Sequence, residues 1–514
     1  MASILAASLS LLILVVVRLW EKGKRKQAEL PSRGFGNLWM SYITSISNVI
    51  RTKAAIQVAA KRYYGQLFTF PLFGEWVVLT TTKEHVKDQL NAPESILSME
   101  AATEELLQTH HTVGPLFCSE TYHIPAIKTA LNLNLANKLP DILDEMLLAF
   151  NEELNLSEDR WSSLRPTTIF PAIITRVSNR VFVGPKLCRN SKYRKLLNGF
   201  SDDIITGGAI IRMVVPGLLR PAVGWLFQLV FGHHRRMTHL LAADITERQR
   251  NRETGNAHLN PNDMLTWLMD QPWEGRTEHA PESLAMRMLN VNFVALHTTS
   301  RAYIHALYHL VAQPEYVLIL RSELETYLDP KNPLAWSKEA LARCVNLDSF
   351  IKESLRLNVH SAMWMPRLTL TPFEFSDGTI VQPNNFIATA ITAVHEDETI
   401  YDHATKFDGL RFSKTEGSVG VDLDVGMDAT NPLWMQRLTG TSSSYLTFGG
   451  GRHICPGRFF ASLQIKCLLA FLILRYDMRL ADGMRLSDSW LGPVSTPAKR
   501  AQVLFRKRGA AVGR

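Results

Sequence analysis

A glycine-rich segment near the C-terminus presents one cysteine in a setting suited to binding a flat metal cofactor. Residues 448–461 read FGGGRHICPGRFFA, with Cys455 directly before a helix-forming run. Glycine lets the backbone turn sharply and approach a ring closely, and Pro456 suits the first turn of a helix. Free amides at that helix start would lower the pKa of the thiol. A thiolate held in this way donates electrons strongly to haem iron and favours O–O bond cleavage.

The same segment resembles the haem-binding signature of the cytochrome P450 family, Phe-x-x-Gly-x-Arg-x-Cys-x-Gly. Phe448, Gly451, Cys455 and Gly457 match it, and His453 stands where the signature has arginine. The resemblance implies that Cys455 is the axial ligand of a haem b iron. It also implies that position 453 meets a haem propionate, to which an imidazole can still donate a hydrogen bond. A structural cysteine buried in a turn is the alternative, and the motifs below make it less favourable.

A second motif lies in the long apolar stretch 281–310, which predicts a helix. Residues 293–300, FVALHTTS, resemble the oxygen-binding segment of the family, Ala-Gly-x-Asp/Glu-Thr-Thr. The resemblance places the small side chain of Ala295 and the hydroxyl of Thr298 beside dioxygen, where a hydroxyl can relay a proton. His297 replaces the usual acid, and an imidazole can also relay protons near neutral pH. The alternative is that Thr298 bonds back to its own helix and His297 faces the core.

A third motif, Glu-x-x-Arg, is formed by Glu353 and Arg356 on a helix predicted within residues 337–357. Side chains at i and i+3 can pair, although such pairs are often surface salt bridges worth under about 1 kcal/mol. A strand-like segment and then the cysteine loop follow this motif, as in the family. The resemblance implies that the pair locks onto an arginine of a downstream meander. Arg411, in the stretch FDGLRF, is the candidate.

Further partners for the haem propionates are predicted at three positions. Arg367 follows the Glu-x-x-Arg helix, where the family often places such an arginine. His123 and Lys128 fall where a Trp-x-x-x-Arg helix usually supplies another cation, although the match there is poor. Solvated surface charge is the alternative at each position.

The expected fold is mainly α with small β-sheets, the cytochrome P450 fold with an N-terminal transmembrane helix. Hydrophobic residues make up 46% of the 514 residues, enough for a large core, and no internal repeat or linker divides the body. We predict an anchor over residues 1–20, a basic, proline-containing linker over 21–35, and one haem-thiolate monooxygenase domain over 36–514. Alternation within 67–81 and 368–389 predicts small hairpins.

Residues 2–17 are uncharged and apolar, and with Leu19 and Trp20 they reach about 28 Å as a helix, close to the thickness of a bilayer core. Lysines and an arginine follow directly, which orients the body toward the cytosol. A cleaved signal peptide would want a basic start and a small-residue cleavage site instead. We therefore expect a single-pass protein of the endoplasmic reticulum membrane.

The net charge of +8 comes from dispersed basic residues, without the basic, aromatic-interleaved stripe typical of nucleic-acid binding. A membrane surface or an acidic redox partner fits better. Five scattered cysteines indicate a reducing compartment rather than a disulfide framework. For a basic docking face, we predict Arg452, Arg458 and Lys466.

The resemblance implies a monooxygenase that hydroxylates a hydrophobic small molecule with O2 and electrons from an NADPH cytochrome P450 reductase. The His-Thr-Thr-Ser, cysteine-loop and Phe-Asp-Gly-Leu-Arg-Phe motifs together look like the fungal branch that acts on secondary metabolites, often of terpenoid or indole-terpenoid type. Two alternatives stay open: a haem-thiolate isomerase or dehydratase that needs no reductase, and a non-catalytic haem-binding membrane protein.

Overall fold

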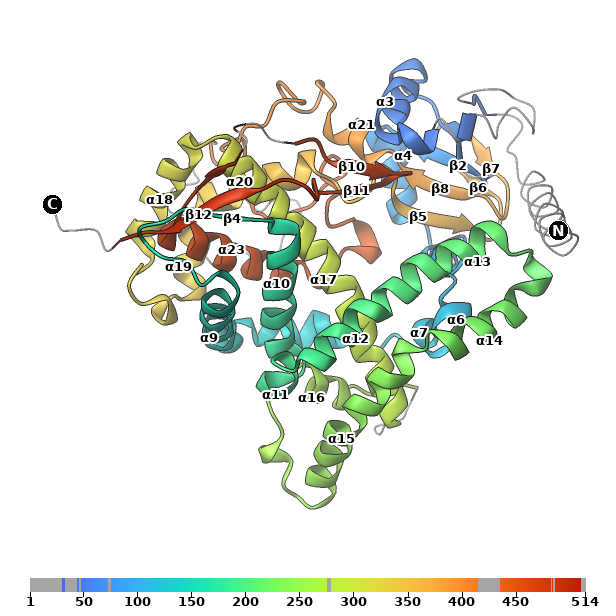
Figure 1. Ribbon diagram of the computed structural model, residues 1–514. Coiled ribbons are helices and arrows are strands. Elements are labelled where there is room, and N and C mark those ends of the chain that lie inside the picture. The colour runs from blue at the N-terminus through green and yellow to red at the C-terminus, as the bar shows by residue number, and fades with distance from the viewer. Residues whose placement is uncertain are drawn as a thin grey trace, which may run out of the picture.

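The computed structural model describes residues 30–32, 44–45, 48–72, 75–274, 279–414, 435–481, 483 and 486–509. It is mainly helical with small sheets, as predicted. One end gathers the strands of the largest sheet, and the other end is built from packed helices (Figure 1). The predicted anchor, residues 1–20, lies outside the described residues, as does the linker 21–35 apart from residues 30–32. None of the described helices is long and apolar enough to cross a membrane.

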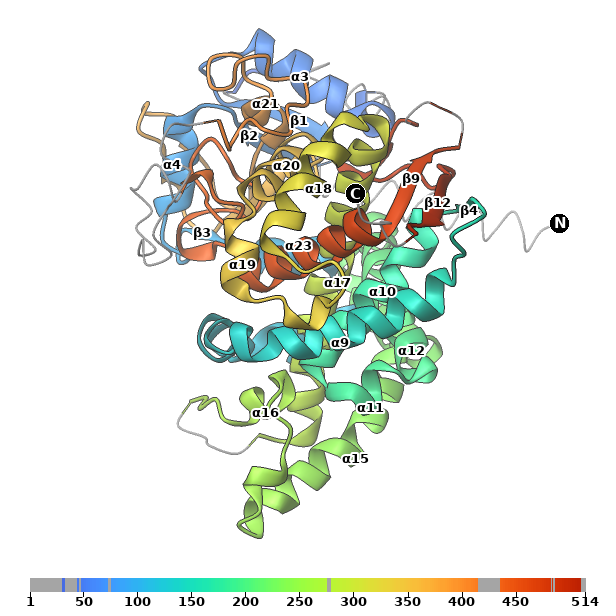
Figure 2. The ribbon, with the colours of Figure 1, turned by 90° about the vertical axis from the view of Figure 1, so that its left-hand side faces the viewer.

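Helix α17, Pro281–Ala312, runs through the middle of the helical part (Figures 1 and 2). Pro281 occupies its first turn, where a missing amide costs nothing, and Glu282 favours the positive end of the helix dipole. Its most extensive packing is against α10 (Pro166–Phe182), α15 (His233–Glu253), α20 (Val345–Leu357) and α23 (Arg458–Arg475). These contacts bury α17 on nearly all sides except near its middle.

The largest sheet has five strands in the order β1-β2-β8-β5-β3, which are Phe68–Leu72, Glu75–Thr80, Phe386–Thr389, Trp364–Thr369 and Leu97–Ser98. The hairpin predicted over 67–81 is confirmed as the antiparallel pair β1 and β2. Strands β2 and β8 pair in parallel, and β5 pairs antiparallel with β8 so that Arg367 lies opposite Ile387. The sheet therefore carries Arg367 on a strand that is hydrogen-bonded on both sides.

Shorter strands form three further sheets. They are the pair β6 (Phe373–Glu374) and β7 (Ile380–Val381), the pair β10 (Ser489–Leu491) and β11 (Val494–Thr496), and the triplet β4 (Ser162–Leu164), β12 (Val503–Lys507) and β9 (Tyr476–Leu480). Strands β6 and β7 form a hairpin within the predicted range 368–389, and the turn between them holds Gly378 at φ 82°. Glycine is favoured there because other residues rarely adopt a positive φ.

The remaining helices surround this framework. Before α10 they are α3 (Thr52–Arg62), α4 (Lys83–Asn91), α5 (Met99–Leu107), α6 (Thr109–Thr112), α7 (Leu116–Ser119), α8 (His123–Ala126), a π-helical turn (Ile127–Leu131) and α9 (Leu135–Leu154). After α10 they are α11 (Gly184–Cys188), α12 (Ser191–Asp202), a second π-helical turn (Asp203–Gly207), α13 (Gly208–Val214), α14 (Arg220–Val230), α16 (Met264–Met269), α18 (Glu315–Tyr327), α19 (Lys338–Arg343) and α21 (Ile391–His395). Single 3₁₀ turns lie at Gly217–Leu219, Ala257–Leu259, Pro333–Ala335 and Gly451–His453.

Candidate haem-binding site

The cysteine loop folds back on itself and against the end of α4. The backbone amide of Cys455 donates to the carbonyl of Phe448 over 2.8 Å, which closes the loop. Gly451 has φ 59°, and a Cβ there would lie 2.6 Å from the carbonyl oxygen of Leu90. Glycine is therefore required at position 451 both by conformation and by the close approach of another backbone.

The sulfur of Cys455 accepts hydrogen bonds from the backbone amides of Gly457 and Arg458, at the start of α23. Burial raises the pKa of the Cys455 thiol, and the two amides and the Arg458 guanidinium lower it by less. The amides at the helix start lower this pKa, as expected, but desolvation of the thiolate outweighs them and makes the net shift upward. The amides nevertheless point at the sulfur, as a thiolate ligand requires.

Arg367, His453 and Glu94 form a cluster of titratable side chains beside the cysteine loop. Arg367 is 2% exposed, and its guanidinium donates to the carbonyl of the neighbouring Pro366 over 2.9 Å. Nε2 of His453 lies 2.8 Å from a carboxylate oxygen of Glu94. Burial first, and then the charge of Arg367, lower the pKa of His453. Burial likewise lowers the pKa of Arg367 to about 10, with Glu94 opposing the shift.

The segment with His123 and Lys128 adjoins the cysteine loop through Asn132. The side-chain amide of Asn132 donates to the carbonyl of Pro456 over 3.4 Å and to that of Lys128 over 3.3 Å. His123 is buried, its Nδ1 has no hydrogen-bond partner, and burial lowers its pKa to about 3. The Lys128 side chain is exposed. A π-helical turn begins between these two residues, so their relative orientation differs from that on a regular α-helix.

The middle of α17 has one open face. Val294 is 51% exposed and Thr298, one turn later, is also exposed, although residues on either side along the helix are buried. Ala295 is half-buried beside them. The hydroxyl of Thr298 donates to the carbonyl of Val294 over 2.8 Å, which is the back-bonding named as the alternative for this residue. That contact still leaves the oxygen of Thr298 accessible from the open face.

His297 lies on a different face of α17 from Thr298, since neighbouring helical residues are about 100° apart. It is half-buried, and burial together with the charge of Arg301 lowers its pKa, while Asp202 on α12 opposes that shift. The imidazole is therefore neutral at neutral pH. Its charged neighbours are Arg301, one turn later on α17, and Asp202 on α12.

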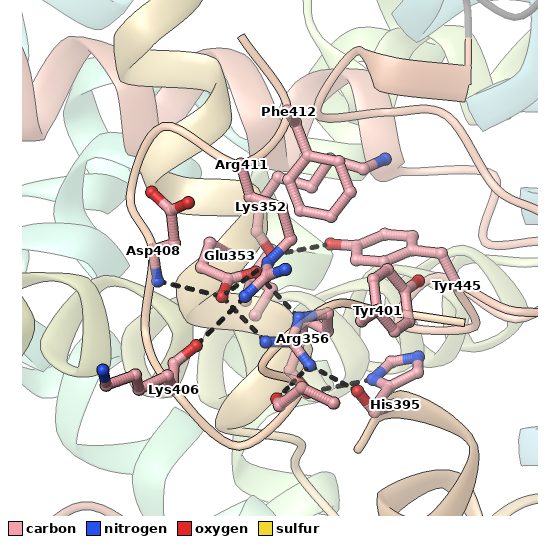
Figure 3. Close-up of polar contacts among 12 residues, drawn as sticks. Lys352, Glu353, Arg356, His395, Tyr401, Lys406, Asp408, Arg411, Phe412 and Tyr445 are labelled. Carbon is pink, nitrogen blue, oxygen red and sulfur yellow. Dashed lines mark hydrogen bonds and ion pairs between the residues drawn. The ribbon is translucent and has the colours of Figure 1, made fainter. Parts of the chain in front are cut away.

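The ion pairs expected among Glu353, Arg356 and Arg411 are present (Figure 3). Arg356 donates to both oxygens of Glu353 over 2.7 and 2.8 Å, and Nε of Arg411 donates to Glu353 over 3.1 Å. Arg411 also donates to the carbonyls of Asp402 and Lys406 over 2.6 and 3.2 Å. Glu353 and Arg356 are fully buried, so the pair is not a surface salt bridge. It holds the meander in place through Arg411.

Lys352 is a structural residue that the sequence did not single out. Its ammonium is buried, donates to the carbonyls of Arg437 and Gly440 over 2.8 and 3.0 Å, and lies 3.9 Å from the centre of the Tyr445 ring. It thus ties α20 to the chain that leads into the cysteine loop. Its place directly before Glu353 was the available signal.

One predicted docking residue is wrong. Lys466 is 6% exposed and is paired with Asp348 at 2.5 Å, because it lies on a face of α23 that packs into the core. Arg452 is exposed, and Arg458 is half-buried against the ring of Phe459. Arg452 remains from the predicted set as a residue on the surface.

Comparison with known proteins decides the family. The family model described as Cytochrome P450 matches residues 39–505. The chain belongs to the cytochrome P450 family. Cytochrome P450 monooxygenases 151 and 103 of Postia placenta are each 33% identical to it, over 93% of this chain and 94% of the first relative, and over 97% of this chain and 97% of the second. Cytochrome P450 monooxygenase paxQ of Penicillium paxilli is 26% identical over 96% of both chains. The chain is accordingly an oxidoreductase of the monooxygenase type.

The residues present fit the haem that a cytochrome P450 carries. Cys455 offers a sulfur with two amides directed at it, and the buried guanidinium of Arg367 has few internal partners. His453 lies beside Arg367, as a pair of propionate contacts requires. The open face of α17 at Val294 and Thr298 leaves room beside the helix. Helix α23, which begins three residues after Cys455, packs against α17 and so joins the two halves of the site.

Proposed function

We propose that this cytochrome P450 hydroxylates or otherwise oxidises a hydrophobic small molecule, a fungal secondary metabolite of terpenoid or indole-terpenoid type. The observation that carries the proposal is the sulfur of Cys455, held by two backbone amides at the start of a helix that packs on the open helix α17. The combination of motifs described above supports the substrate class. The haem, when bound, supplies the oxidising power that activates dioxygen and inserts one oxygen atom into a C–H bond.

The side chains around that centre divide the work. Cys455 would ligate the haem iron, and the amides of Gly457 and Arg458 would moderate the charge on its sulfur. Arg367 and His453 pair with the propionates, and Lys128 and His123 are further candidates from the segment next to the loop. Ala295 leaves space for dioxygen, and Thr298 holds a proton at its hydroxyl beside the oxygen. His297, whose pKa is lowered by burial and by Arg301, is adjacent to Thr298 in the sequence and is a further candidate for proton transfer as a neutral imidazole.

Electrons come from an NADPH cytochrome P450 reductase whose acidic face docks on the side of the cysteine loop. The exposed cations Arg452 and Lys128, each close in sequence to residues that contact this loop, support that orientation. Complementary charge raises the association rate of such transient pairs.

The body faces the cytosol from the endoplasmic reticulum membrane, anchored by residues 1–20. The exposed side chains of α14 and of the turn before it support a second contact with the membrane. Helix α14 and the turn before it expose large apolar side chains, which are Leu218 at 92%, Trp225 at 66%, Leu226 at 54%, Leu229 at 58% and Val230 at 59%. Apolar side chains gathered in this way mark protein or membrane interaction sites, and tryptophan suits the membrane interface.

The test is reductase-dependent labelling. The full chain is coexpressed with the reductase and with the pathway genes that neighbour the gene of this chain. Products are analysed under isotopically labelled dioxygen. One labelled oxygen atom per product, formed only when NADPH and the reductase are present, supports a monooxygenase. Turnover without the reductase and without label would favour the isomerase or dehydratase alternative, and no turnover despite bound haem would favour a non-catalytic haem protein.

A further inference from the structure

The open face of α17 ends in a positive charge. Val294, Thr298 and Arg301 are spaced at i, i+4 and i+7, which places them on one side of the helix. Val294 and Thr298 are exposed and Arg301 is half-buried, whereas His305, the next residue on this side, is 1% exposed. The guanidinium of Arg301 therefore lies at the closed end of the open stretch, one turn from the oxygen-site threonine.

Among the described residues, no carboxylate pairs with Arg301. Burial is the cause that lowers its pKa, and its electrostatic neighbours are the imidazoles of His297 and His360. Two fully buried arginines elsewhere do have a carboxylate, since Arg248 pairs with Asp263 and Arg356 pairs with Glu353. A buried cation without a counter-charge is costly unless something compensates it.

The acids of this region are engaged elsewhere. Asp488 accepts from the side-chain amide of Asn358 over 3.0 Å and lies 3.6 Å from Nδ1 of His305. Asp202 acts on His297, from the side of α12. Neither acid raises the pKa of Arg301. Within the part of the chain that the structure describes, no acid faces Arg301, which leaves a bound anion to supply the counter-charge.

His360 supplies a second polar group at the same end. It lies in the connection between α20 and β5, where its carbonyl accepts from the amide of Ser495 over 3.0 Å. Burial, with the charges of Arg301 and His305, lowers its pKa to about 3, so the imidazole is neutral. Its Nδ1 is buried without a hydrogen-bond partner. A neutral imidazole has one N–H to donate, and a bound oxygen anion would accept it.

A haem propionate is the alternative partner for the guanidinium of Arg301. The cations suited to the propionates are Arg367 and His453, which act on each other and on Glu94. Arg301 acts on neither of them, and they do not act on it. Because both propionates of a haem leave the same edge of the ring, a cation outside the Arg367 cluster is left for another anion.

We propose that Arg301, together with His360, binds a carboxylate of the substrate, so that the substrate is a hydrophobic carboxylic acid held with its carbon skeleton along the open face of α17. The inference rests on the proposed function and narrows its substrate class. It predicts that the acid group is bound one helical turn from Thr298. Oxidation then falls on a carbon that this anchoring brings beside the threonine.

Pairs of a carboxylic acid and its methyl ester test whether the site recognises a carboxylate. Dodecanoic acid and abietic acid, each beside its methyl ester, are titrated into the haem-loaded full chain, and binding is followed by the haem absorbance shift. We expect wild type to bind at least one acid more tightly than its ester, and Arg301→Gln to lose that preference by about tenfold or more, as for a lost charge-assisted pair. Arg301→Lys should keep part of it. Arg343→Gln, an exposed arginine on α19, makes the same change in net charge and should behave as wild type.

Each other outcome is decisive. If no acid binds more tightly than its ester, or Arg301→Gln keeps the preference, the carboxylate site is refuted. If Arg301→Gln loses haem instead, Arg301 serves a propionate and the proposal is wrong. A wild-type protein without the carbon monoxide spectrum of a thiolate-ligated haem would refute the proposed function itself, which separates the two failures.

Discussion

At the scale of single residues, the hydroxyl of Thr298 can bond either to its own helix or to a molecule on the open face of α17. The hydroxyl donates to Val294 within the helix, yet the same oxygen faces the open side of α17. A hydroxyl in that position can pass a proton to bound oxygen when its helix bond is released. His297 is half-buried, whereas Thr298 is exposed, so Thr298 is the hydroxyl that the open face presents.

We predict that Thr298→Ala uncouples NADPH consumption from product formation. The alanine cannot hold a proton beside the oxygen, so more peroxide should be released per NADPH oxidised, with little change in haem content. Thr298→Ser keeps the hydroxyl and is the matched control. Peroxide yields equal to wild type in the alanine variant would remove Thr298 from the mechanism.

Lys352 predicts a pH dependence of stability. Burial lowers its pKa to about 7 in the folded protein, whereas an unfolded lysine titrates near ~10.4. Between these values the unfolded chain binds one more proton than the folded chain, so stability rises with pH across this window and the contribution is constant below it. Lys352→Met should flatten the rise in melting temperature between about pH 7 and 9.5. Parallel curves for the two proteins would contradict the assignment.

Sequence patterns predicted the chemistry-bearing residues whose roles depend on spacing, such as Cys455 within its glycine loop. They did not predict Glu94, Lys352 or Arg301, because those roles depend on neighbours distant in sequence. Glu94 meets His453 only when the end of α4 packs on the cysteine loop. The upward net pKa shift at Cys455 was missed for a similar reason, since burial is a property of the fold.

At the scale of elements, the Glu353–Arg356–Arg411 cluster joins α20 to the meander before the cysteine loop. Arg411 donates both to Glu353 and to several backbone carbonyls. One side chain therefore fixes a segment without regular structure. Buried pairs of this kind destabilise strongly when one partner is removed. The cluster therefore supports the loop that presents Cys455.

We predict that Arg411→Ala lowers the free energy of unfolding by about 3 kcal/mol, as expected for a broken buried pair, and speeds loss of haem. Chemical denaturation and the rate of haem transfer to an acceptor protein measure these effects. Lys406→Ala is the control, because its side chain is exposed and only its carbonyl contacts Arg411. Equal stability of both variants would show that the meander is held by other contacts.

Long elements were the most predictable. The apolar run of 281–310 became α17, and alternation at 67–81 became β1 and β2. The two π-helical turns and the short strands β4, β10, β11 and β12 were missed, because two- to five-residue elements carry little periodicity and are fixed by tertiary contacts.

At the scale of the whole molecule, the exposed apolar side chains of α14 form a surface suited to contact with a membrane. A helix with Trp225 and Leu229 both more than half exposed gains by lying in an apolar or interfacial environment. Together with an anchor over residues 1–20, this surface would hold the open face of α17 accessible to substrates dissolved in lipid.

We predict that deleting residues 1–20 releases most of the protein from membranes, with weak residual vesicle binding through α14. Adding Trp225→Ala and Leu229→Ser to the deletion should abolish that residual binding in a vesicle sedimentation assay. Leu133→Ser, which changes a side chain 81% exposed elsewhere on the molecule, is the control. Tight binding that survives all of these changes would place the membrane contact on another surface.

The central claim is that the sulfur of Cys455 ligates haem iron, and the absorbance spectrum of the reduced protein under carbon monoxide tests it most directly. We predict that the purified wild-type chain gives the long-wavelength band of a thiolate-ligated haem and that Cys455→Ser lacks it. A wild-type chain without bound porphyrin, or a Cys455→Ser variant that keeps the band, would contradict the claim.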